Sequence, residues 1–183
     1  MRKLNRKGFT LIELLAVITI MGILMLVAIP AISRTIENTR RDTFADTAKK
    51  YVDSVRTEVQ SGSLKCHPGD ATKDPVDIAA LPAGTYYYYF DSTRNSGKDI
   101  MEQGGKSSWG NADVIGYVVL KKTINGSKEK YEYSVYMRDT NGRGIDEETP
   151  YDQVKRSAVK ASGAAKITTA KSNTILASQC TLN

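Results

Sequence analysis

The first part of the chain is basic and then apolar. Residues 14–32 are almost continuously hydrophobic, which is about the length at which a helix crosses the hydrocarbon of a bilayer. Cationic flanks stay on the cytoplasmic side, and no acid occurs among the first twelve residues. We therefore expect a single-pass cytoplasmic membrane protein with its N-terminus inside and the remainder exported. The basic residues that set this orientation are Arg2, Lys3, Arg6 and Lys7.

After Pro30 the hydrophobic positions become periodic instead of continuous. Their spacings of three and four predict an amphipathic helix over 33–62 that lays one stripe on the protein's own globular domain. We expect Pro30 to bend the helix because it removes one backbone hydrogen bond. Gly62 suits the left-handed residue at which a helix ends. The apolar stripe consists of Ile32, Ile36, Phe44, Ala48, Val52, Val55 and Val59.

The remaining chain shows strand patterns. Segment 85–90 is rich in tyrosine, and 114–120 and 131–137 flank Asn125 and Gly126, whose preference for positive φ predicts a tight hairpin. A further short strand is expected at 144–146. The predicted fold class is therefore α+β, with a long N-terminal helix packed on an antiparallel sheet.

Four other segments carry weaker patterns. We expect an irregular connection over 64–82 with one turn at 76–80, and a long loop over 91–111. Thr149 and Pro150 have the residue types of a helix start, with Thr as the cap and Pro at the first position. The tail over 166–175 has the composition of a strand.

The net charge of the chain does not indicate a nucleic-acid partner. The formal charge is +6, and subtracting the four basic residues of the N-terminal segment leaves +2. The other lysines and arginines alternate with acids, as on an ordinary solvated surface. We predict no specific nucleic-acid partner.

The two cysteines, Cys66 and Cys180, lie in the part expected to be exported, where disulfides persist. A disulfide between them would close a long loop and raise the free energy of unfolding by about 4 to 5 kcal/mol in the chain-entropy model. Two free thiols are the alternative. A zinc site is disfavoured because His67 is the only histidine.

Catalytic patterns are missing from the sequence. No arrangement of nucleophile, base and acid can be defined around His67, and neither a phosphate-binding loop nor a dinucleotide fingerprint occurs. Residues 139–147 partly match a calcium loop, but Arg143 occupies a ligand position and Pro150 stands where the bidentate acid belongs. We predict a hairpin turn there, and expect no enzyme activity, cofactor or metal.

One motif is specific. The consecutive residues Lys7, Gly8, Phe9, Thr10, Leu11, Ile12 and Glu13 resemble the processing motif of type IV pilins and the related pseudopilins. The resemblance extends to about residue 36. It implies cleavage by a prepilin peptidase between Gly8 and Phe9, N-methylation of Phe9, and addition to a helical homopolymer by an assembly platform and its ATPase. The implied organisation is a leader at 1–8, a membrane and fibre-core half-helix at 9–32, an amphipathic half-helix at 33–62 and a globular head at 63–183.

Glu13 is the one acid in the apolar segment, and a carboxylate at such depth costs roughly 2.5 to 3.5 kcal/mol. It therefore needs a cationic partner. Cleavage after Gly8 would free an amine on Phe9, four residues from Glu13, in the same subunit and in every neighbouring one. Our hypothesis is that Glu13 pairs with a neighbour's Phe9 amine and sets the axial register of the fibre.

Other classes share parts of this pattern. A pseudopilin of a type II secretion or DNA-uptake apparatus would have the same head motif and form a short rod. A removed signal peptide or a plain signal anchor would also begin with basic and then apolar residues. A monomeric membrane-anchored binding protein or enzyme would retain residues 1–8 and would not polymerise.

Overall fold

The computed structural model describes residues 8–92, 105–110 and 112–182. The chain divides into two compact units, residues 1–39 and residues 40–183, and each is described by itself. Most of the predicted leader and most of the predicted loop at 91–111 lie outside the described residues.

Helix α1 runs over Leu11–Ser61 and contributes to both units. In the first unit it continues through Pro30 without ending there. It contains a window with mean hydropathy 2.7, which makes it long and apolar enough to cross a membrane. The surface of this part of the helix is apolar on all sides, as expected for a segment that is surrounded by lipid or by other helices.

The end of α1 confirms the predicted stop at Gly62. Gly62 has φ of 70°, in the left-handed region. The Ser63 amide donates to the Glu58 carbonyl at 3.1 Å and the Gly62 amide donates to the Val59 carbonyl at 3.4 Å. These two bonds are the pair of a Schellman motif, and they satisfy carbonyls that the end of the helix would leave open.

The second unit, called the head here, contains a seven-stranded sheet in the order β2-β1-β7-β3-β4-β5-β6. The neighbouring strands are antiparallel except that β7 runs parallel to β3. This bears out the predicted α+β class with a mostly antiparallel sheet. The strands are β1 (Leu64–Cys66), β2 (Val76–Asp77), β3 (Gly84–Asp91), β4 (Val114–Asn125), β5 (Lys128–Asp139), β6 (Gly144–Pro150) and β7 (Gln179–Leu182).

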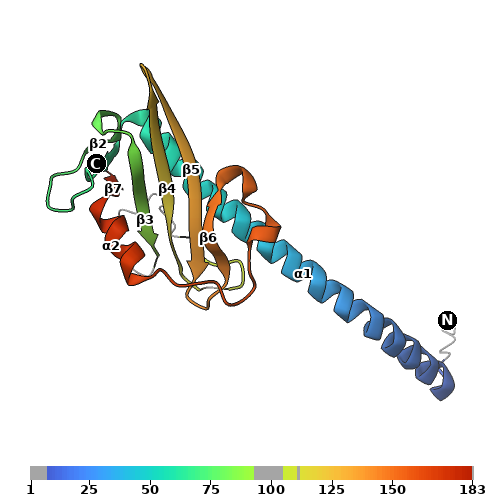
Figure 1. Cartoon of the computed structure of the whole chain (residues 1–183). Coiled ribbons are helices and arrows are strands. Elements are labelled where there is room, and N and C mark those ends of the chain that lie inside the picture. The colour runs from blue at the N-terminus through green and yellow to red at the C-terminus, as the bar shows by residue number, and fades with distance from the viewer. Residues whose placement is uncertain (1–7, 93–104, 111, 183) are drawn as a thin grey trace, which may run out of the picture. The chain divides into compact units, whose positions relative to one another are not determined.

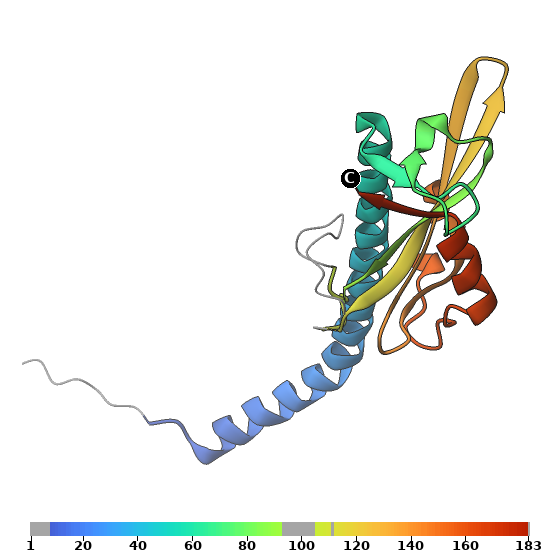
Figure 2. The same ribbon diagram turned by 90° about the vertical axis from the view of Figure 1, so that its left-hand side faces the viewer.

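Helices cover both faces of this sheet (Figures 1 and 2). The part of α1 within the head packs on the inner face, where Phe44, Ala48, Val52 and Val55 of the predicted stripe are buried. Tyr51, which the stripe did not include, is also fully buried. The short helix α2 (Thr169–Ala177) covers part of the outer face.

Two contacts show how the inner face is held together. The Tyr51 ring stacks on Phe90 of β3 with centroids 3.9 Å apart, and its hydroxyl accepts a hydrogen bond from the Gly105 amide at 3.0 Å. Arg156, in a 3-10 turn at Arg156–Ala158, forms a two-pronged ion pair with Asp42 of α1. The hydrogen bonds from Arg156 hold the pKa of Asp42 below its usual value.

On the outer face, three tyrosines from adjacent strands form a ladder. The rings of Tyr117 and Tyr136 are stacked at 5.0 Å, and Tyr87 meets Tyr117 edge to face at 5.8 Å. The ammonium group of Lys171 on α2 lies 4.6 Å from the Tyr87 ring centre and pairs with Glu148. Burial raises the pKa of the Tyr117 hydroxyl above its usual value.

The strands predicted at 85–90, 114–120, 131–137 and 144–146 are confirmed, and each is longer than expected. Strand β3 covers the predicted 85–90, and β4 and β5 form the hairpin around Gly126, which has φ of 62°. Strand β6 covers the predicted 144–146. In 64–82 the structure has a 3-10 turn at Ile78–Ala80, close to the predicted turn, but it also forms strands β1 and β2, which the sequence did not reveal.

The helix start predicted at Thr149 is wrong. Thr149 and Pro150 end strand β6, where they lie opposite Val135 and Ser134 of β5. Pro150 is tolerated because β6 is an edge strand. Short 3-10 turns follow at Tyr151–Gln153 and Arg156–Ala158 instead of an α-helix.

The strand predicted at 166–175 is also wrong, because most of this segment forms α2. The β-branched residues there favour a strand locally. However, Thr168 caps the helix by accepting a hydrogen bond from the Lys171 amide at 3.2 Å, and Ile175 is buried against the tyrosine ladder. Capping and tertiary packing therefore outweigh a weak local preference.

Lys122 is a buried cation that the sequence analysis did not identify. Its ammonium group donates to the carbonyls of Ile78, Ala79 and Leu81 at 2.8 to 3.1 Å and pairs with Glu129 at 2.9 Å. We expect Lys122→Met to lower the free energy of unfolding by about 3 kcal/mol, because three carbonyls and a carboxylate lose their partner together.

Urea denaturation of the full-length protein in detergent, followed by the fluorescence of Trp109, measures this loss. Trp109 is the single tryptophan and its ring lies 5.6 Å from that of Phe44 in the core. The control is Lys121→Met, because Lys121 is 61% exposed and lies 3.8 Å from Glu132. We expect that control to change stability by less than about 0.5 kcal/mol. Equal effects of the two substitutions would contradict the role given to Lys122.

Candidate functional site

The Gly8–Phe9 peptide bond precedes the first helical residue, Leu11. A Cβ placed on Gly8 would meet no other atom within 4 Å, and the Phe9 side chain is 88% exposed. This bond therefore has an open, non-helical backbone on both sides. A protease needs such access, because it must bind the chain in an extended form around the bond that it cuts.

Thr10 and Glu13 form a capping box at the start of α1. The Thr10 amide and hydroxyl both donate to Oε2 of Glu13 at 2.8 Å, and the Glu13 amide donates back to the Thr10 hydroxyl at 3.3 Å. The spacing of a threonine and a glutamate three residues later is the recognised signature of this motif. The sequence analysis considered Glu13 only as a charge and missed this second role.

The capping box supplies hydrogen bonds to the Glu13 carboxylate but no positive charge. Among the described residues no ion pair of Glu13 is found. Its neighbours in the sequence, Ile12 and Leu14, are apolar and strongly exposed, as are Phe9 and Leu11. Glu13 and Phe9 thus lie at the same end of the helix, and their pairing between subunits stays a prediction.

The rest of the apolar half-helix presents hydrophobic groups all round. The Thr19 hydroxyl donates to the Ala16 carbonyl at 2.8 Å, and directly after this half the hydroxyls of Ser33 and Thr35 donate to the Ile29 and Ala31 carbonyls at 3.0 and 3.1 Å. Large exposed apolar patches mark a membrane or protein contact. The exposed apolar residues are Phe9, Leu11, Ile12, Leu14, Leu15, Val17, Ile18, Ile20, Met21, Ile23, Leu24, Met25, Leu26, Val27, Ile29, Ile32 and Ile36.

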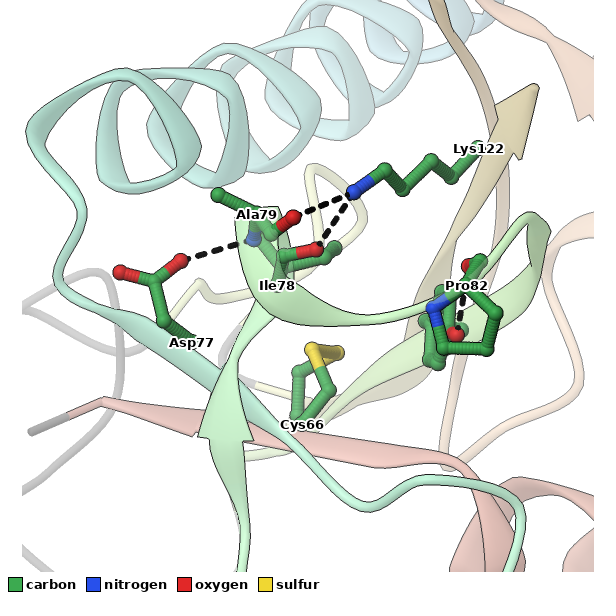
Figure 3. The surroundings of a disulfide bond; sticks show 8 residues. Cys66, Asp77, Ile78, Ala79, Pro82 and Lys122 are labelled. Atoms are coloured by element: carbon green, nitrogen blue, oxygen red, sulfur yellow. Dashed lines mark hydrogen bonds between the residues drawn. A yellow bond between two sulfur atoms is a disulfide. The ribbon is translucent and has the colours of Figure 1, made fainter. Parts of the chain in front are cut away.

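Cys66 and Cys180 form the predicted disulfide, with their sulfur atoms 2.04 Å apart. They lie opposite each other in the β1–β7 pair, and both are buried. Figure 3 shows Cys66 near the turn of Ile78 and Ala79, whose carbonyls receive the Lys122 ammonium. The disulfide and the Lys122 contacts therefore fix neighbouring parts of the head.

The other candidate ligand groups have structural roles. His67 Nδ1 lies 2.7 Å from the Lys73 carbonyl within a loop. Asp139 accepts hydrogen bonds from the Asn141 and Arg143 amides at 3.0 and 2.8 Å and from the Ser107 hydroxyl at 2.8 Å. This geometry confirms the predicted turn after β5. In the described part of the chain, no group of three or more potential metal-binding side chains occurs.

Comparisons with known proteins agree with this arrangement. A family profile described as the prokaryotic N-terminal methylation motif matches residues 3–29. A fimbrial protein of Moraxella nonliquefaciens is 30% identical over 144 residues, which cover 69% of this chain and 91% of the relative. No solved structure matches. The chain belongs to the type IV pilin family.

The disulfide gives a test of what holds the head together. We expect replacement of both Cys66 and Cys180 by alanine to lower the free energy of unfolding by about 4 kcal/mol, because the bridge spans 114 residues of chain. Urea denaturation with and without dithiothreitol measures the loss. The reductant should destabilise the wild-type protein by a similar amount and leave the double variant unchanged. A wild-type protein that is indifferent to reduction would contradict this role.

Proposed function

We propose that this chain is a structural subunit of a type IV pilus. The peptidase cuts after Gly8, Phe9 is N-methylated, and the mature subunit polymerises through α1 into a helical surface fibre. The observation that carries the proposal is the combination of an accessible Gly8–Phe9 bond with an all-round apolar helix directly after it. Processing and burial of the helix are then consecutive steps at one end of the chain.

The proposed organisation has four parts. Residues 1–8 are the leader, 9–32 the membrane and fibre-core half-helix, 33–62 the amphipathic half-helix and 63–183 the head. The stripe residues from Phe44 to Val55, which are buried against the sheet, support a division of α1 into two environments. Pro30 belongs to the first half, where its missing amide leaves the Leu26 carbonyl without its helical donor and favours a bend.

Before assembly, the subunit is held in the cytoplasmic membrane as a single-pass protein with its N-terminus inside. The basic residues before the apolar segment support this orientation. The partners in this scheme are the prepilin peptidase, the assembly platform with its ATPase, and further copies of the chain. After assembly the apolar half-helices lie in the fibre core, which removes their side chains from both lipid and water.

Glu13 and the Phe9 amine supply the register in this proposal. A charged pair buried in an apolar core is costly to break, because an unpaired charge there is destabilised by several kcal/mol. Apolar helices without such a pair can slide past one another with little change in energy. The capping box gives Oε2 of Glu13 hydrogen bonds but no positive charge, and in this proposal the Phe9 amine of a neighbouring subunit supplies that charge.

Gly8→Val tests the processing step. The branched side chain of valine next to the cleaved bond restricts the backbone that the peptidase must bind. We expect the precursor to accumulate in the membrane and surface fibres to fall at least tenfold. Mass spectrometry of the N-terminus and electron microscopy of the cells measure the two effects. The matched control is Gly22→Val within α1, which we expect to be processed normally. A mature N-terminus at Phe9 in the Gly8→Val variant would contradict the assigned cleavage site.

Glu13→Gln and Thr10→Ala separate the charge of Glu13 from its capping role. Glutamine can still complete a capping box, but it leaves the Phe9 amine without a counter-charge. We expect Glu13→Gln to reduce the yield of sheared fibres at least tenfold. Thr10→Ala removes the cap at a cost of about 1 kcal/mol and should leave most of the fibre yield intact. The opposite order of the two yields would refute register control by charge.

A further inference from the structure

Strands β4 and β5 continue beyond the strands on either side of them. The pairing of β3 with β4 ends at Lys122, and the pairing of β6 with β5 ends at Ser134. Residues 123–133 therefore form a two-stranded hairpin arm that projects from the sheet (Figure 1). The tip of the arm, residues 123–127, has no charged residue, and Ile124 within it is 47% exposed.

A pocket of about 490 Å³ lies on the outer face of the head, beside α2. We call it the outer pocket. All the residues that line it are uncharged, and they combine apolar side chains with hydroxyl and amide groups. They include Tyr89, Ile167, Ser172, Leu176 and Gln179. Leu176 is 50% exposed.

The arm and the outer pocket lie toward opposite ends of the sheet. Tyr89 of the pocket lies opposite Tyr117 of β4, and Asn125 at the tip of the arm is eight residues further along that strand. This corresponds to about 27 Å at the rise of an antiparallel strand. The tip of a molecule therefore cannot reach its own pocket. A contact between the tip of one copy and the pocket of another joins two different surfaces. Each copy then still has a free tip or a free pocket, so further copies can be added and the assembly is open.

The exposed apolar residues of the head favour this contact. Among the described residues of the head, the large hydrophobic side chains that are exposed are Val76, Ile124 and Leu176. Two of these three lie on the tip and in the outer pocket. Covering both with a second copy removes them from water, which is the driving force of most protein association.

The charges of the lining residues favour the outer pocket over a second pocket beside it as the site for the tip. A second pocket of about 320 Å³ shares Tyr89 and Ile167 with the outer pocket but is also lined by Arg138 and Lys166. The arm carries both signs of charge, with Lys128, Glu129 and Lys130 close to the tip, and its tip is uncharged. An uncharged tip in the second pocket would cover Arg138 and Lys166 without giving them a partner, whereas the outer pocket has no charge to cover.

We infer that the tip of the hairpin arm of one subunit inserts Ile124 into the outer pocket of another subunit in the fibre. This inference rests on the proposed function, because it names a contact between heads in the assembled pilus. The occupant of the pocket is a second copy of this chain, and the contact adds a bond between heads to the packing of the apolar helices.

Cysteine cross-linking in sheared fibres tests the contact. In the full-length chain, Ile124→Cys and Ser172→Cys together place one thiol on the tip and one on the wall of the outer pocket. We expect mild oxidation to link subunits into a ladder on non-reducing gels, at least tenfold more abundant than in either single variant. The control pairs Val76→Cys with Ser172→Cys, because Val76 is 39% exposed and lies outside both tip and pocket. Fibres that form without a ladder, or that give an equal ladder with the control pair, would overturn the inference.

A second variant keeps the test independent of thiol chemistry. Ile124→Asp puts a charge on the tip that an uncharged pocket cannot pair. We expect the temperature at which fibres dissociate into subunits to fall by at least 5 °C, while Val76→Asp leaves it unchanged. Unaltered dissociation of Ile124→Asp fibres would overturn the inference but leave the proposed function intact. Absence of fibres from cells that express the wild-type chain would instead refute the proposed function.

Discussion

The first half of α1 must be kept out of water, and the rest of the protein depends on this constraint. Its exposed isoleucines, leucines, valines and methionines would cost free energy in proportion to their area in any aqueous environment. Lipid provides one solution and a bundle of identical helices provides another. A helix that moves from lipid into a bundle of identical helices needs few specific bonds to the other helices. It does need an interaction that fixes the positions of the helices relative to one another. Glu13 is suited to that task because it is the one acid in an otherwise apolar surface.

The head is built so that its part of α1 is not easily separated from the sheet. Tyr51 stacks on Phe90, Arg156 pairs with Asp42, and the part of the apolar stripe from Phe44 onward packs on the inner face, whereas Ile32 and Ile36 are exposed. These contacts come from three different parts of the chain. Removing the helix would expose all of them together, so helix and sheet should unfold as one cooperative unit.

Elements with strong local signals could be predicted from the sequence, and those that depend on distant partners could not. Gly62 and Gly126 marked a helix end and a turn because the left-handed backbone strongly favours glycine. The segment that forms α2 has a β-branched composition, and only burial of Ile175 against the sheet decides in favour of a helix. Strands β1 and β2 are too short to show a period.

Two features of the candidate site were readable in the sequence but were missed. Thr10 and Glu13 have the spacing of a capping box, and Lys122 continues the alternation of Val118 and Leu120 on the inner face of β4. A charged residue at an inward position should have prompted a search for its partners. Those partners are carbonyls of residues 78, 79 and 81, which carry no side-chain signal.

Strand β7 lies between β1 and β3, although it is formed by residues 179–182. Strands β1 and β2 come more than a hundred residues earlier in the chain, and β7 is the strand through which they pair with the rest of the sheet. The sheet therefore cannot close until residues 179–182 are in place, and the thiol of Cys66 stays unpaired until Cys180 reaches it. Because this last pairing joins segments 114 residues apart in the chain, closure of the sheet is a slow step of folding.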